Sequence, residues 1–371
     1  MARFVAMVLI LAALSACGQK ESAQSPAAPA EPIASGEVVT ADQLGPFASD
    51  VSDVAFWTNT KVPFQGLVLV ATADGVTAFN IEDGETVSEV EAAKATGVEV
   101  VYSGSGATAR GIAIIAANGG LRFEEIANDT RAFKSLASKG APTNVGTFCA
   151  GPDRDGTLKL FAIYGKSIAA FSLAINDDVT VTASANAKAP ADIAGCVVDP
   201  VDGSVFLAGV DAAIYRLASN GEIDPAPFAK SAASKPTAIG LALNGLVEGG
   251  ATEECCGQIA LLDASDARVL LFDRDDGKAI GAVRLSSSFD VEGVAVATAM
   301  GLGYGNFGGV YRDGVLALAT DGDTPHVRLA PLNGALDSLS TPMGETADPR
   351  ALSPQEPVDD GLIINVDLVN E

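Results

Sequence analysis

Hydrophobic residues alternate with polar or small residues along most of this chain, in short runs that occur in pairs. The pairs begin at residues 66, 111, 158, 203, 257 and 314, and each contains a turn of residues such as Gly, Asp, Asn or Ser. Alternation with a period of two predicts β-strands with one buried face, and a tight turn between two of them predicts a β-hairpin. The hairpins recur every 45–57 residues, which is the spacing expected for the blades of a β-propeller.

One further apolar stretch precedes each hairpin. These stretches are residues 52–57, 97–103, 144–150, 193–199, 238–244 and 291–297. We expect them to be the innermost strands, which line a central channel and use glycine where neighbouring backbones crowd together. The fourth, outer strands are expected in connections such as 179–189 and 278–285. The chain is thus predicted to be an all-β, six-bladed β-propeller over residues 46–371, with minimal helix; an unrelated β-solenoid or sandwich is the alternative.

The C-terminal sequence "GLIINVDLV", residues 361–369, alternates as a strand does. We expect it to close the ring by pairing with strands from the other end of the chain, because a closed sheet leaves no open edge.

The N-terminus has a basic residue, a short apolar run and the sequence Leu14-Ser15-Ala16-Cys17. This is the pattern of a bacterial lipoprotein signal, so residues 1–16 are expected to be removed and Cys17 to receive lipid; an ordinary secretory signal is the alternative. Residues 17–45 are rich in Ala, Pro, Ser and Glu, which predicts a flexible linker. We therefore expect a protein anchored to a membrane of the bacterial cell envelope, on the periplasmic face or at the outer membrane.

Charge and cysteine content restrict the chemistry. The net charge is −24, so the protein is expected to repel nucleic acid, and phosphate-rich ligands as well unless cations bridge them. A single histidine, His326, makes histidine-based zinc or iron sites unlikely. Besides Cys17 there are four cysteines, which allow three pairings. Because Cys149 and Cys196 lie on inner strands of adjacent predicted blades, we hypothesise a disulfide between them; Cys255 and Cys256 then form a vicinal disulfide or stay reduced.

Three segments resemble the β-propeller (alkaline) phytase family. They are the opening "SDVAFW" with its first hairpin (52–85), "AGCVVDPVDGSVFLAGVDAAIYRL" (194–217), and the glycine-rich stretch that begins "VEGVAVA" (291–323). The resemblance implies a 3-phytase, which removes phosphate from myo-inositol hexakisphosphate with several calcium ions at one mouth of the channel. Calcium binds carboxylate oxygens, offsets phosphate charge and activates the attacking water.

The family's acidic positions are only partly retained. Matching by motif places the surviving carboxylates at Asp53, Glu99 and Glu292, and Lys166 at a phosphate contact. The family's other acids correspond to Ser52, to Ala194, to Gly209 and Val210, and to positions in the segment 237–241. Because the three retained acids fall on adjacent predicted blades, we expect one calcium site there, with fewer ions than in the family.

Two main functions follow from this comparison. The first is a phytase-like phosphohydrolase with a degraded calcium and phosphate site, which would act on inositol phosphates or similar small molecules. The second is a non-catalytic propeller that binds a partner or a small ligand at the channel mouth. A third is a sugar- or lactone-acting hydrolase with one calcium ion, for which the sequence indicates no catalytic acid or base.

Overall fold

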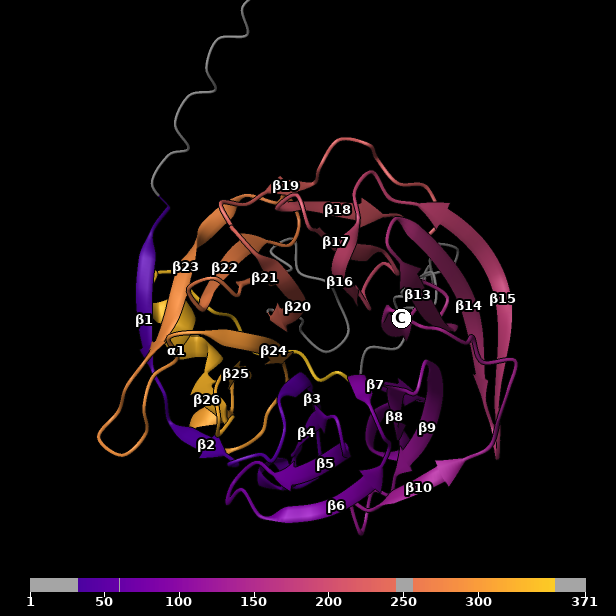
Figure 1. Ribbon diagram of the computed structural model, residues 1–371, viewed down its shortest axis with the longest axis horizontal. Coiled ribbons are helices and arrows are strands. Elements are labelled where there is room, and N and C mark those ends of the chain that lie inside the picture. The colour runs from indigo at the N-terminus through magenta and orange to yellow at the C-terminus, as the bar shows by residue number, and fades with distance from the viewer. Residues whose placement is uncertain (1–32, 60, 245–255, 351–371) are drawn as a thin grey trace, which may run out of the picture. The chain divides into compact units, whose positions relative to one another are not determined.

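The computed structural model of the protein describes residues 33–59, 61–244 and 256–350. These residues form six sheets arranged in a ring around a central axis (Figure 1), and neighbouring strands are antiparallel except where β1 and β11 join sheet edges. The protein is therefore a six-bladed β-propeller, as the sequence predicts. Helix is minimal in the described part of the chain: one α-helix, α1 (Leu332–Asp337), and three short 3-10 helices.

Each blade has four main strands, and the six predicted hairpins form its second and third strands. From the inside outwards, the first blade contains β3 (Val51–Trp57), β4 (Leu67–Thr72), β5 (Gly75–Asn80) and β6 (Thr86–Glu91). The second blade contains β7 (Ala95–Ser103), β8 (Arg110–Ala117), β9 (Gly120–Ile126) and β10 (Phe133–Leu136). The third contains β12 (Thr147–Pro152), β13 (Leu158–Tyr164), β14 (Ser167–Ile175) and β15 (Val179–Lys188), with β11 (Ser138–Lys139) beyond β15.

The other three blades follow the same order. The fourth blade contains β16 (Ile193–Val198), β17 (Val205–Gly209), β18 (Ala213–Leu217) and β19 (Ala229–Lys230). The fifth contains β20 (Pro236–Asn244), β21 (Cys256–Asp263), β22 (Arg268–Asp273) and β23 (Ala279–Ser286). The sixth contains β24 (Ala297–Gly303), β25 (Val315–Thr320) and β26 (Val327–Pro331), with β2 (Asp42–Leu44) outermost. The predicted outer strands at 179–189 and 278–285 correspond to β15 and β23.

The inner strands lie side by side around the channel in the order β3, β7, β12, β16, β20, β24 and back to β3 (Figure 1). They run in the same direction, so their first residues form one mouth of the channel and their last residues the other. Glycine allows the close approach: a Cβ on Gly301 of β24 would lie 2.6 Å from the backbone oxygen of Val54 on β3. A side chain at this position would therefore push two blades apart.

The sixth inner strand differs from the prediction. It is β24, at 297–303, rather than the stretch 291–297. Residues before β24 instead form the loop that leaves the outer strand β23, where the backbone amide of Val294 donates to the carbonyl of Leu285 at 3.0 Å. Both stretches are small and apolar, so their patterns alone do not distinguish a loop packed on the sheet from the strand.

The N-terminal segment belongs to the sheets. Strand β2 pairs antiparallel with β26 of the sixth blade, and β1 (Ser35–Val39) pairs parallel with β23 of the fifth (Figure 1). The prediction of a linker that extends to residue 45 is therefore wrong at its C-terminal end. The physical reason is burial: Val38 and Leu44 place their side chains in the apolar clusters between blades.

Several sequence predictions fall outside the described residues. These are the signal peptide, lipidation of Cys17, the linker before residue 33, a bond between Cys255 and Cys256, and a closing strand at 361–369. Within the described residues, no helix reaches the length and apolar character needed to cross a bilayer.

The core is divided among six apolar clusters, one in each interface between neighbouring blades. The cluster between the first and second blades contains Trp57, whose side chain is fully buried. Asp53, Ala55 and Trp57 share one face of β3, because alternate residues of a strand point the same way. The packing of Trp57 in this interface fixes that face towards β7.

Candidate functional site

A cavity of about 830 Å³ follows the central channel, and inner strands of all six blades line it. Threonine, alanine, glycine and aliphatic residues make up most of its wall, with several aromatic side chains. Three acidic residues line it: Asp53, Glu99 and Asp155. No lysine, arginine or histidine of the described chain lines this cavity. The described wall of the channel therefore carries acidic groups and no basic group that would offset their charge.

Asp53 lies near the start of β3, in the first blade, and its carboxyl group forms a hydrogen bond with the second blade. Its Oδ1 accepts a hydrogen bond from the backbone amide of Val54, and its Oδ2 accepts one from the amide of Val98 on β7, both at 2.9 Å. Burial raises the pKa of Asp53 to about 7, although these two hydrogen bonds favour the ionised form.

Glu99 lies on β7 and lines the same cavity. No described residue forms a hydrogen bond with its carboxyl group. Burial, followed by the negative charge of Asp53, raises the pKa of Glu99 to about 8. Asp53 and Glu99 thus form an acidic pair, hereafter the channel pair, that is costly to ionise fully.

A carboxylate elsewhere in the fold shows what a structural role requires. Asp263, at the end of β21, is buried, and burial alone would raise its pKa. The backbone amides of Ser234, Lys235 and Ser265 and the Ser265 hydroxyl donate to it, and its pKa falls to about 2. Arg268 lies 3.2 Å away. Glu99 receives no such hydrogen bond from any described residue, so a structural role does not account for its position.

The structure does not bring Glu292 to the channel pair. Glu292 lies in the loop before β24, its side chain is 91% exposed, and its nearest cation is Arg328 at 4.0 Å. The expected set of three acids on adjacent inner strands is therefore not assembled, because the sixth inner strand begins later than predicted. Val145, from the inner stretch predicted at residues 144–150, lies before β12 and packs in the core between the second and third blades.

Calcium would need six to eight oxygen ligands, most of them from carboxylates. Within the described residues, no three side chains among His, Cys, Asp and Glu converge as a metal site. The oxygens of Asp53 are already engaged by two backbone amides. The residues of this channel therefore do not fit a cluster of several calcium ions.

Lys166, expected at a phosphate contact, lies in the exposed turn between β13 and β14. Its ammonium group donates to the backbone oxygen of Pro190 at 3.0 Å, and it does not line the channel. Ser52, at the position of a lost family acid, bridges blades: its hydroxyl donates to the carbonyls of Ala71 and Ala95 at 3.2 and 3.0 Å. Neither residue provides a phosphate-binding group inside the cavity.

The sequence gives no indication of a segment that crosses the other mouth of the channel. Residues 346–350, hereafter the strap, contact the ends of four inner strands. The Thr346 hydroxyl accepts a hydrogen bond from the amide of Gly305 at 2.8 Å, and the amide of Ala347 donates to Leu243 at 3.1 Å. Pro349 lines the cavity. The strap thus covers part of the mouth farther from Asp53.

Arg350 holds the end of the strap against the first two blades. Its guanidinium lies 4.7 Å from the ring centroid of Trp57 and 5.1 Å from that of Tyr102. The amide of Gly106 donates to its backbone oxygen at 2.8 Å. Arginine over an aromatic face is a favourable contact, so this end of the strap is fixed to the blades that hold the channel pair.

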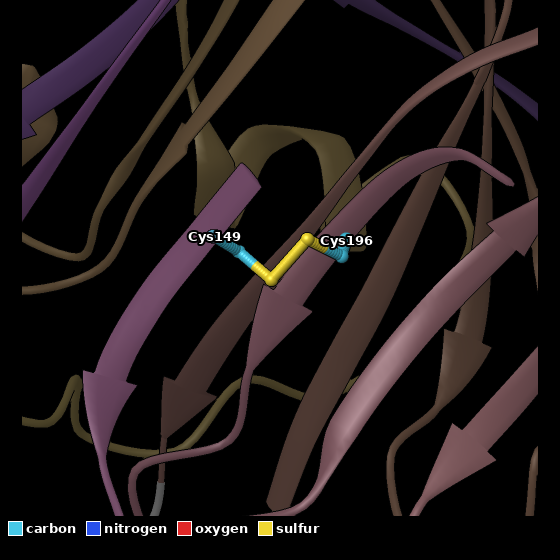
Figure 2. The surroundings of a disulfide bond; sticks show 2 residues. All are labelled: Cys149 and Cys196. Carbon is cyan, nitrogen blue, oxygen red and sulfur yellow. A yellow bond between two sulfur atoms is a disulfide. The ribbon is translucent and has the colours of Figure 1, made fainter. Parts of the chain in front are cut away.

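Cys149 and Cys196 form a disulfide across the interface of the third and fourth blades (Figure 2). This is the pairing expected from the sequence. The two strands that it joins, β12 and β16, both line the channel, and Cys196 itself contributes to the wall. The bond thus fixes the channel wall farther from the channel pair.

Glu99→Gln is expected to stabilise the protein in alkaline solution. The usual pKa of Glu99 is 4.5 and the folded value is about 8, so the folded state binds more protons between these values and stability falls as pH rises through them. Glutamine does not ionise, and the change should raise the free energy of unfolding by about 2 kcal/mol at pH 9. Thermal unfolding at pH 4 and 9 measures this; an equal effect at both values would contradict it.

Compared with models of known protein families and with curated proteins, the chain matches none.

Proposed function

We propose that this protein is a non-catalytic binding propeller, whose small-molecule ligand lies in the central channel. One observation carries the proposal: the channel contains two partly buried carboxyl groups and no basic side chain among the described residues that line it. The cavity of about 830 Å³ is within the usual size of a ligand pocket.

The same observation argues against a phytase-like hydrolase, which the resemblance suggests. Inositol hexakisphosphate is a dense polyanion, and it would meet a carboxyl pair and a protein of net charge −24. Like charges a few ångströms apart repel strongly in a partly buried site, unless cations lie between them. Among the described residues, the channel has neither the carboxylate cluster that would hold such cations nor basic residues that would replace them.

The sequence pattern around Cys17 supports a further part of the proposal. A lipid on that cysteine would hold the propeller at a membrane of the cell envelope, with the channel outside the cytoplasm. Oxidising conditions there also suit the disulfide between Cys149 and Cys196. We therefore propose that the ligand is met in the cell envelope.

Phosphate release from inositol hexakisphosphate tests the choice between the two functions. The purified full-length protein is incubated with the substrate, with millimolar calcium and with a chelator. We expect no release above the rate without protein in either condition, because no basic side chain of the described residues lines the channel to bind phosphate. Calcium-dependent release that is lost in Asp53→Ala or Glu99→Gln would contradict the binding-protein proposal.

A further inference from the structure

We propose that the exposed edge of β15 binds the C-terminal segment of the same chain, residues 361–369, as an additional strand of the third blade. This segment lies outside the described residues. The inference concerns a surface away from the channel and does not rest on the proposed binding function. It follows from an open strand edge, from the place where the described chain ends, and from the match in size and charge between the two segments.

The outer edge of β15 is open over most of its length. Figure 1 shows this strand at the outer rim of the ring. It has ten residues, and β11 pairs with only two of them, Val179 and Thr180. Residues 182–186 are exposed, and no other strand of the described chain pairs with this edge. Backbone groups of alternate residues there point away from β14, and such an edge is a template for a further strand.

The other blades protect their outer edges. In the fifth and sixth blades, β1 and β2 cover the edges of β23 and β26, and the outer strands β10 and β19 have only four and two residues. The outer strand of the first blade, β6, carries Glu89 and Glu91, and charges on an edge strand discourage pairing. The only charged residue of β15 is Lys188, at its end. Within the described residues, β15 is thus the one long edge without such protection.

The segment 361–369 alternates as a strand does, but the place first expected for it is taken. Strand β2, from the N-terminal part of the chain, already pairs with β26 and completes the sixth blade. A single apolar strand is not stable alone in water, because its hydrophobic face and its backbone groups need a sheet. A different open edge is therefore the expected partner of this segment.

The described chain ends close to the start of β15. The guanidinium of Arg350 donates to Oδ1 of Asn128 at 3.2 Å, and Nδ2 of Asn128 donates to the backbone oxygen of the residue before Arg110 at 3.3 Å. Arg110 in turn donates to the backbone oxygen of Asn176, in the turn before β15, at 2.8 Å. Residues 351–360 separate Arg350 from the proposed strand, and an extended chain of this length spans up to about 33 Å. The segment can therefore reach the free edge, and pairing there would hold the strap over the channel mouth from its C-terminal side.

The side chains of the two segments are complementary in size. Ala183, Ser184 and Ala185 are small and exposed, and Phe171 of β14, which pairs with Ala183, is only partly buried. The large apolar residues at alternate positions of the C-terminal segment are Leu362, Ile364, Val366 and Leu368. Since neighbouring strands lie about 4.8 Å apart, such a side chain beside Ala183 would reach the ring of Phe171 and cover it.

The charges of the two segments are also complementary. Residues 351–371 contain five acidic residues and no lysine or arginine. Lys139 on β11 and Lys188 at the end of β15 are both exposed, and they lie at the two ends of the free edge. Opposite charges favour this pairing, whereas most of the surface of a protein with net charge −24 would repel the segment.

Amide hydrogen exchange of the full-length protein, resolved to single residues by NMR, tests the inference. The edge of β6 is the internal reference, because no described strand pairs with its outer side. We expect the outward-pointing amides of residues 182–188 to exchange at least about tenfold more slowly than those of β6, since hydrogen bonding to a further strand protects them. Equal exchange at the two edges would overturn the proposal, and this comparison requires no variant.

Proline variants identify the segment that provides the protection. The double variant Ile364→Pro/Asn365→Pro replaces two consecutive residues, so one of the two lost N–H groups faces β15 in either register. It should raise the exchange of residues 182–188 by about tenfold or more and leave β6 unchanged. Val358→Pro is the matched control, because it lies in the same C-terminal tail before the proposed strand, and it should change neither edge. Unchanged protection in the double variant would show that residues 361–369 are not the partner.

Light scattering at several protein concentrations distinguishes the same chain from a second copy. The proposal predicts a monomer whose β15 amides are equally protected at every concentration. Protection that appears only as a dimer forms would mean that a second copy covers the edge, and it would contradict the proposal.

Discussion

Replacing Trp57 by alanine is expected to lower the free energy of unfolding by about 3–5 kcal/mol, the usual cost of removing a large aromatic side chain from a core. Trp57 is fully buried between the first two blades, and a Cβ added to Gly111 would lie only 2.3 Å from its Nε1. The neighbouring strands cannot close such a gap without moving β3 against β7. Urea unfolding followed by circular dichroism measures the loss.

Two further variants show whether packing is the cause. Trp57→Phe should cost much less, because it keeps a ring in the interface and removes an indole N–H that has no hydrogen-bond partner among the described residues. Phe289→Ala is the matched control, since that aromatic side chain is fully exposed and its removal should change stability by less than about 0.5 kcal/mol. A loss for Trp57→Ala no larger than that of the control would contradict this account of the interface.

Removing the disulfide is expected to have the second large effect. Cys149 and Cys196 are 47 positions apart in the sequence. A cross-link that closes a loop of this length lowers the entropy of the unfolded chain, which raises the free energy of unfolding by about 4 kcal/mol. The double variant Cys149→Ala/Cys196→Ala should therefore unfold at a clearly lower urea concentration. Wild-type protein unfolded with a reductant present should approach the same midpoint.

Alkylation provides the direct control for the bond. Cys149 and Cys196 should resist alkylation in the denatured protein until a reductant is added, as peptide mapping of the separate cysteines shows. Modification of Cys149 without reduction would exclude the pairing. A double variant as stable as the wild type would show instead that the bond forms but contributes little to stability.

Most of the architecture could be predicted because its determinants are local and repeated. Each hairpin combines a two-residue alternation with a turn, and six such units at a nearly constant spacing allow few folds. The position of Trp57 could also be predicted, since it follows Asp53 and Ala55 on the same face of an inner strand. These predictions required no knowledge of contacts between distant parts of the chain.

The errors concern segments whose role depends on distant contacts. Strands β1 and β2 lie in a stretch whose composition is typical of a linker, and they become ordered only because the fifth and sixth blades offer open edges. The strap, residues 346–350, has no local sequence pattern at all. Its position follows from contacts with Leu243, Gly305 and Gly106, which are far away in the sequence.

The candidate site was predicted in part. The sequence placed Asp53 and Glu99 on adjacent inner strands, and the structure has them both in the wall of the channel. It placed Glu292 with them by motif similarity, but a shift of the sixth inner strand leaves Glu292 exposed in a loop. The raised pKa values of the pair could not be predicted, because they depend on how completely the other blades exclude water and cations from the channel.

The channel holds two buried carboxyl groups, and no basic side chain of the described residues lines its wall. NMR titration of the side-chain carboxyl carbons tests it directly, with Asp53→Asn and Glu99→Gln used to assign the two signals. We expect the pair to titrate with apparent pKa values of about 7 and about 8. Titration of both groups below about pH 5, as for ordinary exposed carboxyl groups, would contradict it.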